Sequence, residues 1–518
     1  MKLSSILSII TSLIVFASFG QNNGFQAGFE SITAADLSHH LHIIASDSFE
    51  GRGTGDEGQH KAALYLAQQF EKLGLKPGNP ANTANPYYQP IELVEKTWES
   101  VTLKTAAKSY QFLKDYYAYG DIQLPELTTM EIVCAGYGIE HKNYSDYKKL
   151  DVTNKAVIIF PGEPYINGVS VITGNVAPSN WANDWRAKSQ LALQKGAKAV
   201  FIVVGNTDDE FYKRLYSIKE HLNKPVLGFT HKKKASAFFI PTSMAAALLK
   251  TKKEKLIAYK KSLGTNPRYP FKKSVIEAQV KVKIKQIPTE NVLGLIPGEV
   301  YPEEIVVVTA HYDHLGIEDG KICYGADDDG SGTVAILELA QAFQLAAQNG
   351  QRPKRSILFM PVTGEEKGLM GSEYYTDKPV YPLSNTVADL NIDMIGRIDT
   401  LHSDKKYVYI IGSNRLSTEL HDLSEKANRE HAHLFLDYRY NSTDDPNRYY
   451  YRSDHYNFAK NNIPVIFYFS GIHEDYHKPT DTVDKIDFEK MVWITQLVYA
   501  TLWEIANLDH KLKVDITE

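Results

Sequence analysis

The sequence predicts an α/β protein built on a mostly parallel mixed sheet with helices on both faces. After Pro288, apolar strands without polar interruptions alternate with helical patterns. Strands of this kind are typical of parallel sheets that are buried on both sides. The chain has 518 residues, more than one hydrophobic core usually supports, so we expect two domains.

The first element, residues 1–20, is expected to be a signal peptide. Lys2 supplies a positive charge, Ile6 to Phe16 is a short apolar run, and Ser18-Phe19-Gly20 has the small-x-small pattern of a cleavage site. The run is shorter than the roughly 20 apolar residues that span a bilayer. We therefore expect a periplasmic or secreted protein without stable membrane insertion after cleavage. The alternative is an uncleaved N-terminal anchor.

The middle of the chain differs in character from both ends. Apolar residues at helical spacing predict a helix that ends at Gly74, before a loop rich in Pro, Gly and Asn. From Met130 to Leu263, short strands and a helix suggest a β-rich α+β insert. The expected domains are therefore 21–129 together with 264–518, and an inserted domain at 130–263.

After Pro288 the pattern becomes strand, polar motif, helix, repeated. One helix carries apolar residues from Ile336 to Phe343 on one face, and the last helix runs from Phe488 to about Leu508. The expected strands are Ile305–Ala310, Ser356–Val362, Val387–Ile392, Tyr407–Ile411 and Pro464–Phe469.

Composition excludes some functions. Hydrophobic residues make up 43% and charged residues 23%, as in ordinary globular enzymes. The net charge of -5 argues against nucleic acid as a partner, because phosphate binding needs a basic surface. Cys134 and Cys323 are the only cysteines, so a cysteine-ligated metal site is excluded by number. We expect two buried thiols, although pairing stays open, as does the oligomeric state.

Residues of metal-ligand type follow the ends of several predicted strands, where α/β sheets gather their functional groups. His311 and Asp313 are two apart on a strand and face the same side. A carboxylate that accepts the second ring N–H of a ligating imidazole fixes the tautomer of that ring. Alone, this triplet is weak evidence for a metal.

Two further motifs are rich in acid. Asp327, Asp328 and Asp329 stand between glycines, and adjacent carboxylates repel one another unless a positive charge lies among them. Glu365 and Glu366 follow another strand, and neighbouring side chains that point differently suit two roles, Glu366 toward a metal and Glu365 toward substrate. Taken alone, the aspartates are better explained as a solvated acidic loop with a helix cap, and the alternative for the glutamates is an exposed pair at a helix start, favoured by the helix dipole.

Asp393 closes an apolar strand, where a charge is rarely buried unpaired. His477 follows the last strand, and Asp481 or Asp454 is a candidate for supporting contacts. Charge counting links the motifs: Asp327, Glu366, Asp393 and one hydroxide carry four negative charges, which two Zn²⁺ ions balance. His311 and His477 would complete the ligand shells as neutral donors. Oxygen and imidazole ligands suit zinc, with cobalt or manganese as alternatives.

This order of motifs resembles the co-catalytic di-zinc aminopeptidase family, whose relatives include glutamate carboxypeptidases and glutaminyl cyclases. The resemblance covers Thr33 to about Pro90 and Pro288 to the end. It implies a zinc exopeptidase fold and a cis peptide between Asp327 and Asp328. The implied ligands of two zinc ions are His311 and Asp393 on one metal, Glu366 and His477 on the other, and Asp327 as the bridge.

The resemblance also implies catalytic roles. Asp313 would orient His311, Glu365 would be the general acid and base for a water shared by the metals, and Tyr476 would hold the oxyanion. The insert resembles a protease-associated domain at Gly136-Tyr137-Gly138, Asp151-Val152 and Lys195-Gly196-Ala197. Such an insert suggests a role in substrate access.

The function expected from this resemblance is an exported aminopeptidase that removes N-terminal residues from peptides. Dipeptidase, carboxypeptidase or glutaminyl-cyclase chemistry on the same scaffold is the second hypothesis. A third is a receptor-like binding protein without catalysis, which the intact ligand set argues against. The aromatic run from Tyr438 to Tyr456 is a candidate for the specificity pocket or for surface packing.

Overall fold

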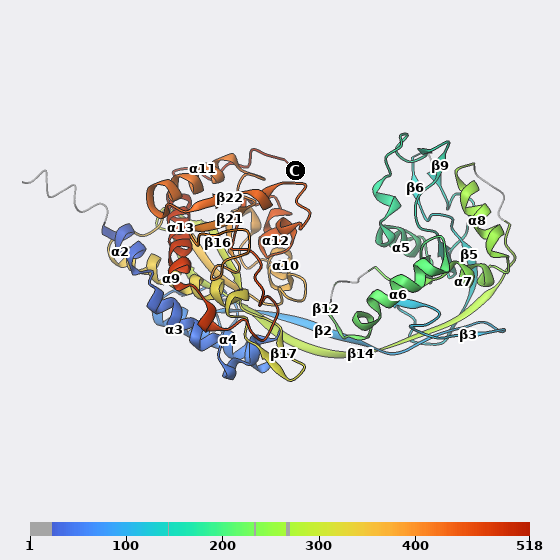
Figure 1. Cartoon of the computed structure of the whole chain (residues 1–518), viewed down its shortest axis with the longest axis horizontal. Coiled ribbons are helices and arrows are strands. Elements are labelled where there is room, and N and C mark those ends of the chain that lie inside the picture. The colour runs from blue at the N-terminus through green and yellow to red at the C-terminus, as the bar shows by residue number, and fades with distance from the viewer. Residues whose placement is uncertain (1–22, 143, 231, 233–234, 266–269, 518) are drawn as a thin grey trace, which may run out of the picture. The chain divides into compact units, whose positions relative to one another are not determined.

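A computed structural model describes residues 23–517 except 143, 231, 233–234 and 266–269. The predicted signal peptide, residues 1–20, lies outside the described residues. Among the residues that are described, no helix combines the length and apolarity needed to cross a membrane. The chain divides into two compact units: unit 1 contains the residues up to Ile91 and from Pro288 onward, and unit 2 contains Glu92–Ile287 (Figure 1).

Unit 1 is built on an eight-stranded mixed sheet with the order β1-β15-β19-β16-β20-β23-β21-β22. The central strands β19, β16, β20 and β23 are parallel to one another, and β15 and β21 run antiparallel to their inner neighbours. Within the sheet the bounds are β1 Lys76–Pro77, β15 Gly294–Ile296, β19 Arg355–Val362, β16 Tyr301–His311, β20 Thr386–Ile392, β23 Val465–Phe469, β21 Tyr407–Ile411 and β22 Phe435–Asp437. A separate hairpin joins β17 Gly316–Glu318 to β18 Lys321–Cys323.

Helices cover both faces of this sheet, which confirms the predicted fold class. Val306, Val308 and Phe359 face a core made with α2, α3, α4, α9, α11 and α13, whereas Val307 and Leu358 face the core that α10 and α12 join (Figure 1). Their bounds are α2 Asn23–Ser31, α3 Ala34–Ile44, α4 Glu57–Leu73, α9 Gly332–Gln348, α10 Met370–Asp377, α11 Thr418–Ala427, α12 His455–Ala459 and α13 Phe488–Asn507.

Alternating residues of one strand thus serve two cores, because successive side chains in a strand point to opposite faces. The predicted helix end at Gly74 is also present: this glycine has a left-handed φ of 82° and its N–H bonds to the carbonyl of Glu71. Glycine takes this conformation without strain, which explains the stop.

Unit 2 contains a nine-stranded sheet. Eight of its strands follow the order β12-β2-β14-β5-β8-β11-β13-β4, and the ninth, β3, pairs with β2. Strands β5, β8, β11 and β13 are parallel. Helices α5 and α6 pack on one face and α7 and α8 on the other. The helices are α5 Trp185–Gln194, α6 Asp208–Asn223, α7 Thr242–Leu248 and α8 Lys253–Ser262.

The strands of unit 2 are β2 Tyr88–Lys104, β3 Ser109–Tyr110, β4 Tyr117–Tyr119, β5 Thr128–Cys134, β6 Glu140–His141, β7 Tyr144–Ser145, β8 Ala156–Ile159, β9 Tyr165–Ile166, β10 Val169–Ser170, β11 Ala199–Val203, β12 Val226–Phe229, β13 Ala237–Ile240 and β14 Val275–Val292. Two short hairpins, β6–β7 and β9–β10, lie outside the large sheet. Cys134 is on β5 and Cys323 is in unit 1; both are buried, and no disulfide joins them.

The boundaries of unit 2 differ from the predicted insert at 130–263. The chain segments before and after that range belong to unit 2, because β2 and β14 contribute strands to its sheet. Both strands are long, 17 and 18 residues, and run on into unit 1. The likeness of the insert to a protease-associated domain stays a prediction.

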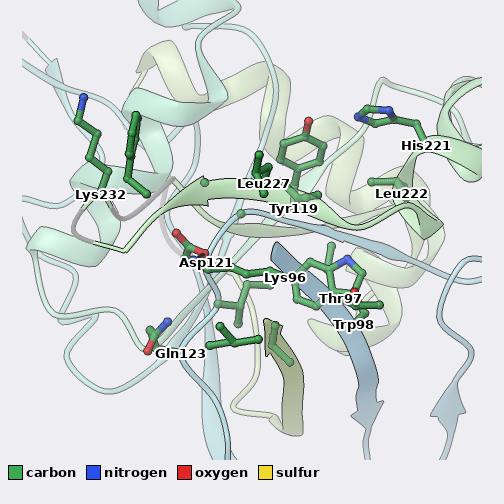
Figure 2. A pocket seen from close by; sticks show the side chains of 18 residues that line it. Lys96, Thr97, Trp98, Tyr119, Asp121, Gln123, His221, Leu222, Leu227 and Lys232 are labelled. Atoms are coloured by element: carbon green, nitrogen blue, oxygen red, sulfur yellow. Dashed lines mark hydrogen bonds and ion pairs between the residues drawn. The ribbon is translucent and has the colours of Figure 1, made fainter. Parts of the chain in front are cut away.

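One side of unit 2 holds a cavity of about 150 Å³, here called the β12 cavity. Trp98 of β2, Leu222 at the end of α6 and Leu227 of β12 contribute apolar surface (Figure 2). Tyr119 and His221 also line it.

The helix α9 buries one acid in the core of unit 1. Glu338 is 1% exposed, and only one of its carboxyl oxygens has a hydrogen bond, accepted from the N–H of Thr33 at 3.5 Å. Burial, reinforced by Asp36, raises the pKa of Glu338 to about 8. The folded state therefore holds a proton that the unfolded state releases near pH 4.3.

We expect Glu338→Gln to stabilise the protein above pH 5. Between about pH 4.5 and 8 the native state binds more protons than the unfolded state, so the stability of the wild type falls as pH rises through that window. At about 1.4 kcal/mol per unit, the substitution should raise the free energy of unfolding by roughly 2–4 kcal/mol at pH 8. Thermal unfolding at pH 5 and pH 8 measures this, with Glu30→Gln on the exposed side of α2 as control. Parallel pH dependence in wild type and Glu338→Gln would contradict the prediction.

Candidate metal centre

Four strand ends of unit 1 bring the predicted site residues to one edge of the sheet. His311 is the last residue of β16, and Glu365 and Glu366 follow β19. Asp393 follows β20, and His477 lies eight residues after the end of β23. These four strands are parallel, so their carboxyl ends share one edge, where α/β proteins place their ligands.

The first group of ligand atoms comes from His311, Asp328 and Asp393. The Nε2 atom of His311 is 3.2 Å from Asp328 Oδ1 and 3.7 Å from Asp393 Oδ1. All three residues are buried, and their ligand atoms lie within 4.8 Å of one another. Ser453 donates a hydrogen bond of 2.7 Å to Asp393 and so fixes that carboxylate.

The second group shares Asp328 with the first. His477 Nε2 is 3.1 Å from Asp328 Oδ2 and 3.2 Å from Glu366 Oε2. His314 Nδ1 is 2.8 Å from Glu366 Oε1 and 3.8 Å from Asp328 Oδ2. The two oxygens of one carboxylate, that of Asp328, thus face two different groups of ligands.

The predicted bridge, Asp327, is wrong by one position. Its Oδ1 accepts a hydrogen bond of 2.6 Å from the N–H of Gly396, and its Oδ2 lies 3.3 Å from His473 Nε2. Asp327 therefore points away from His311 and His477. The backbone turns irregularly here, with φ and ψ of -101° and 99° at Asp328, and spacing alone does not reveal which of three adjacent carboxylates faces the site.

The predicted cis peptide is displaced in the same way: it joins Asp328 to Asp329, not Asp327 to Asp328. Asp329 has a third role. Its carboxylate accepts hydrogen bonds from the N–H groups of His311, Gly332 and Met394, and so ties β16, α9 and the segment after β20 together. The three aspartates serve one site in three different ways.

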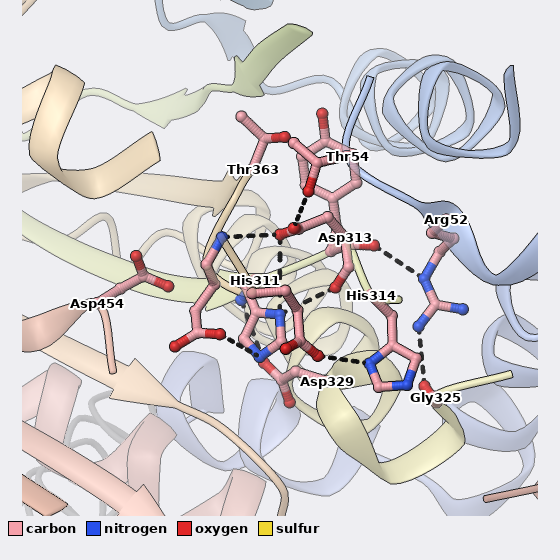
Figure 3. A network of polar contacts seen from close by, with 12 residues as sticks. Arg52, Thr54, His311, Asp313, His314, Gly325, Asp329, Thr363 and Asp454 are labelled. Atoms are coloured by element: carbon pink, nitrogen blue, oxygen red, sulfur yellow. Dashed lines mark hydrogen bonds and ion pairs between the residues drawn. The ribbon is translucent and has the colours of Figure 1, made fainter. Parts of the chain in front are cut away.

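Neighbouring side chains hold this aspartate loop in place. Asp481 Oδ2 accepts hydrogen bonds from the N–H groups of Asp327 and Asp328, which answers the open question of whether Asp481 supports the site. The buried guanidinium of Arg52 donates to the carbonyls of Tyr312 and Gly325, each at 2.8 Å (Figure 3). Arg52 was not recognised from the sequence, because its partners are backbone carbonyls that no motif marks.

Asp313 lies beside His311, but its carboxylate does not hold the ring. His311 Nδ1 donates to the backbone carbonyl of Asp313 at 2.9 Å, while the carboxylate is 3.9 Å away. That carboxylate instead accepts hydrogen bonds from the Thr54 hydroxyl at 2.6 Å and from the N–H of Glu365 at 3.1 Å (Figure 3). Asp313 thus orients His311 through its main chain and Glu365 through its side chain.

Glu365 is placed to serve as a proton acceptor. Its Oε2 is 3.9 Å from His311 Nε2, and its side chain is 13% exposed, so it can reach a molecule in the cleft. Burial, opposed by His311 and reinforced by Glu366 and Asp393, raises the pKa of Glu365 well above its usual value. The charge of Asp454 contributes to this rise in the pKa of Glu365, and the carboxylate of Asp454 is itself held by the Ser372 hydroxyl.

A small cleft of about 40 Å³ opens beside these residues. His311, Asp328, Glu365 and Asp393 form its polar end, and Tyr476 stacks on His477 with ring centroids 3.9 Å apart. The other walls come from Met394, Tyr449, Arg452, Phe467, Phe469 and Ile472. The aromatic run from Tyr438 to Tyr456 therefore contributes Tyr449 and Arg452 to the cleft.

His314 is the second residue that sequence reasoning left without a role. It follows Asp313 directly, and its ring lies against His477 with centroids 5.9 Å apart. Its Nε2 is buried and has no hydrogen-bond partner among the described residues. Its position in the sequence, directly after Asp313 and three residues after His311, could have marked it as a candidate ligand.

The donor set fits a pair of zinc ions. Two ligand atoms that each lie about 2.1 Å from a tetrahedral zinc ion are roughly 3.4 Å from one another. The distance from His311 Nε2 to Asp328 Oδ1 is 3.2 Å, and that from His477 Nε2 to Asp328 Oδ2 is 3.1 Å. Asp328 Oδ2 and Glu366 Oε1 are buried, and each lies close to an imidazole nitrogen, His477 Nε2 at 3.1 Å and His314 Nδ1 at 2.8 Å. Despite burial, contacts with Asp328 and Glu366 raise the pKa of His477 to about 10, so the carboxylates attract positive charge to this point.

Residues 291–502, which carry the ligand groups and Glu365, match the model of peptidase family M28. This confirms, for that part of the chain, the family resemblance drawn from the motifs. The match does not extend over unit 2.

Individual relatives agree with this assignment. A probable leucine aminopeptidase of Arthroderma otae is 32% identical over 224 residues, which cover 42% of this chain and 57% of the relative. Aminopeptidase YwaD of Bacillus subtilis is 26% identical over 255 residues, covering 46% of this chain and 49% of the relative. The alignments thus span about half of each relative's length.

A solved structure shows the same fold. The aminopeptidase from Aneurinibacillus sp. strain AM-1 superposes with a TM-score of 0.51 and 19% sequence identity. The similarity covers 95% of this chain and 98% of that one. At this identity the likeness concerns the fold.

Proposed function

We propose that this chain is a zinc-dependent exopeptidase, an aminopeptidase that removes N-terminal residues from peptides. The observation that carries the proposal is the carboxylate of Asp328, whose two oxygens face two groups of ligands 3.1–3.2 Å away. His311 and Asp393 would hold one ion, and Glu366 with His477 the other. The aminopeptidase names of the relatives and the match of residues 291–502 to the model of peptidase family M28 support this choice.

When bound, two zinc ions supply Lewis-acid activation of the attacking water and of the substrate carbonyl. Glu365 takes the proton of that water and passes it to the leaving amine. Asp313 fixes Glu365 for this task through the hydrogen bond to its N–H. Burial and the nearby acids raise the pKa of Tyr476, so its hydroxyl keeps its proton and can donate to the developing oxyanion.

The apolar residues of the cleft wall support a preference for an apolar side chain at the N-terminal position. Phe467, Phe469 and Met394 are each no more than 3% exposed, and burying an apolar side chain against them contributes about 25 cal/mol per Å². One observation favours the alternative of a dipeptidase or carboxypeptidase. Arg452 lines the cleft, stacks on Tyr449 at 4.9 Å and forms no ion pair with another described residue, so it could meet a substrate carboxylate.

A substrate panel separates these activities. We expect hydrolysis of leucine p-nitroanilide, little hydrolysis of its N-acetylated form, and loss of activity in a chelator that zinc restores. A dipeptidase would cleave Leu-Gly and leave the anilide intact, and a carboxypeptidase would accept N-blocked peptides. Full activity after exhaustive chelation would contradict the proposal of metal dependence.

We also propose that the protein is exported, periplasmic or secreted, on the strength of the charge and apolar pattern of residues 1–20. N-terminal sequencing of the protein from a cell fraction outside the cytoplasm tests this. A mature chain that begins after Gly20 is expected, and an intact chain retained in the cytoplasm would contradict it.

A further inference from the structure

Unit 2 contains a second concave surface that the proposed reaction does not use. It is a cleft of about 650 Å³, within the range of ligand sites in proteins. Phe160 and Pro161 follow the end of β8, Val204 and Gly205 follow the end of β11, and all four line it. Because β8 and β11 are parallel, the cleft begins where α/β folds commonly bind ligands, beyond the carboxyl ends of the strands.

Aromatic rings form the wall of this surface, here called the aromatic cleft. Tyr117 and Phe239 stack with centroids 4.7 Å apart and planes within 3°. Trp185 meets Phe239 edge to face at 5.0 Å, and Tyr119 lies 6.1 Å from Trp185 in the same manner. Phe239 and Tyr117 are 7% and 4% exposed, whereas Trp185 is only partly buried and can contact a ligand. Such rings favour another flat apolar group.

Two arginine side chains lie beside the aromatic wall. Arg186 lies over the ring of Trp185 at 4.9 Å, and Arg214 interacts with the hydroxyl of Tyr117. Both guanidinium groups are exposed, and neither forms an ion pair with another described residue. Guanidinium groups bind carboxylates through paired hydrogen bonds, so this rim suits an anion.

The remaining charged groups of the cleft are already engaged. Lys188 is 2% exposed and donates to the carbonyls of Phe160 and Gly162. Glu210 accepts hydrogen bonds from Thr207 and from the N–H of Asn206 at the start of α6. The charged groups left to bind a ligand are therefore the two arginines, because Lys188 and Glu210 are already hydrogen-bonded within unit 2.

We propose that the aromatic cleft binds the C-terminal residue of a peptide, with an aromatic side chain against Trp185 and the free carboxylate on Arg186 and Arg214. The adjoining β12 cavity suits the residue before it. Tyr119 and His221 line both the aromatic cleft and the β12 cavity, and Figure 2 shows these two side chains with the apolar residues Leu222 and Leu227. An apolar penultimate side chain would lie there.

Calorimetric titration of the full-length protein with N-acetyl-leucyl-phenylalanine tests the proposal. This probe has no free amine, so an aminopeptidase does not hydrolyse it, and chromatography of the recovered probe checks that binding is measured without turnover. We expect saturable binding that weakens about ten-fold or more when the carboxylate is replaced by an amide, because a charged partner of the arginines is lost. N-acetyl-leucyl-alanine should bind several-fold more weakly, because it lacks the ring.

The double variant Arg186→Gln/Arg214→Gln should weaken the binding of the acid about ten-fold or more and leave the amide almost unchanged. Lys213→Gln/Lys219→Gln, which removes two exposed charges from α6, the helix that carries Arg214, is the matched control and should bind like the wild type. Hydrolysis of leucine p-nitroanilide should be equal in all of these proteins, so the outcome is independent of the proposed function. Equal binding of acid and amide, or undiminished binding by the arginine variant, would overturn the proposal.

Discussion

Replacing Glu365 by Gln is expected to lower kcat for leucine p-nitroanilide by about 10³-fold or more while zinc content stays near two ions per chain. General acid and base groups typically contribute roughly 10²- to 10⁴-fold, and glutamine cannot accept the proton of the attacking water. The amide keeps the shape of the side chain and does not alter the backbone N–H that donates to Asp313. Steady-state kinetics with metal analysis of the same sample measure both quantities.

Lys367→Gln is a control for this variant. Lys367 follows Glu366 directly and is exposed, so its substitution changes charge near the site without touching the ligand groups. Activity of the Glu365 variant within about ten-fold of the wild type would remove Glu365 from the mechanism. Loss of zinc in that variant would instead assign Glu365 a role in holding the metal.

Asparagine substitutions at Asp327 and Asp328 should differ widely in their effects. Asp328→Asn removes the charge from the carboxylate that faces both ligand groups, so we expect loss of at least one zinc ion per chain. Catalytic efficiency should then fall by about 10³-fold or more, because activation of the water depends on the metals. Asp327→Asn keeps an oxygen that accepts from the N–H of Gly396, and should retain both ions. Zinc analysis and kinetics of this adjacent pair form a matched comparison.

The reverse result, in which Asp327→Asn loses zinc and Asp328→Asn keeps it, would restore the bridge implied by the sequence. Equal and small effects of both substitutions would argue that neither carboxylate binds metal. Thermal unfolding of both variants shows whether a loss of activity comes from a loss of fold instead.

The fold of unit 1 was predictable because its strands are short apolar runs. Ile305–Ala310 and Ser356–Val362 carry no charge, and such segments have few alternatives to a buried strand. The boundaries of unit 2 were not predictable in the same way. Strand β14 has lysines at positions 281, 283 and 285 and runs through the boundary without a break, so composition gives no sign of a new domain.

The site shows the same limit at the scale of single residues. His311, Glu366, Asp393 and His477 could be placed because each stands near a strand end in a distinct motif. Asp327 and Asp328 could not be told apart, since their difference depends on backbone dihedrals fixed by Asp481 and Arg52 from distant parts of the chain. The aromatic cleft was not foreseen for a related reason: Tyr117, Trp185 and Phe239 meet only when the sheet of unit 2 forms.

A crystal structure of the zinc-loaded protein, with anomalous scattering measured at the zinc edge, tests the central claim most directly. We expect two peaks in unit 1, each about 2.0–2.2 Å from one oxygen of Asp328, with His311 and Asp393 on one and Glu366 and His477 on the other. No zinc signal at these residues, or a single peak without contact to Asp328, would contradict the proposed bridge.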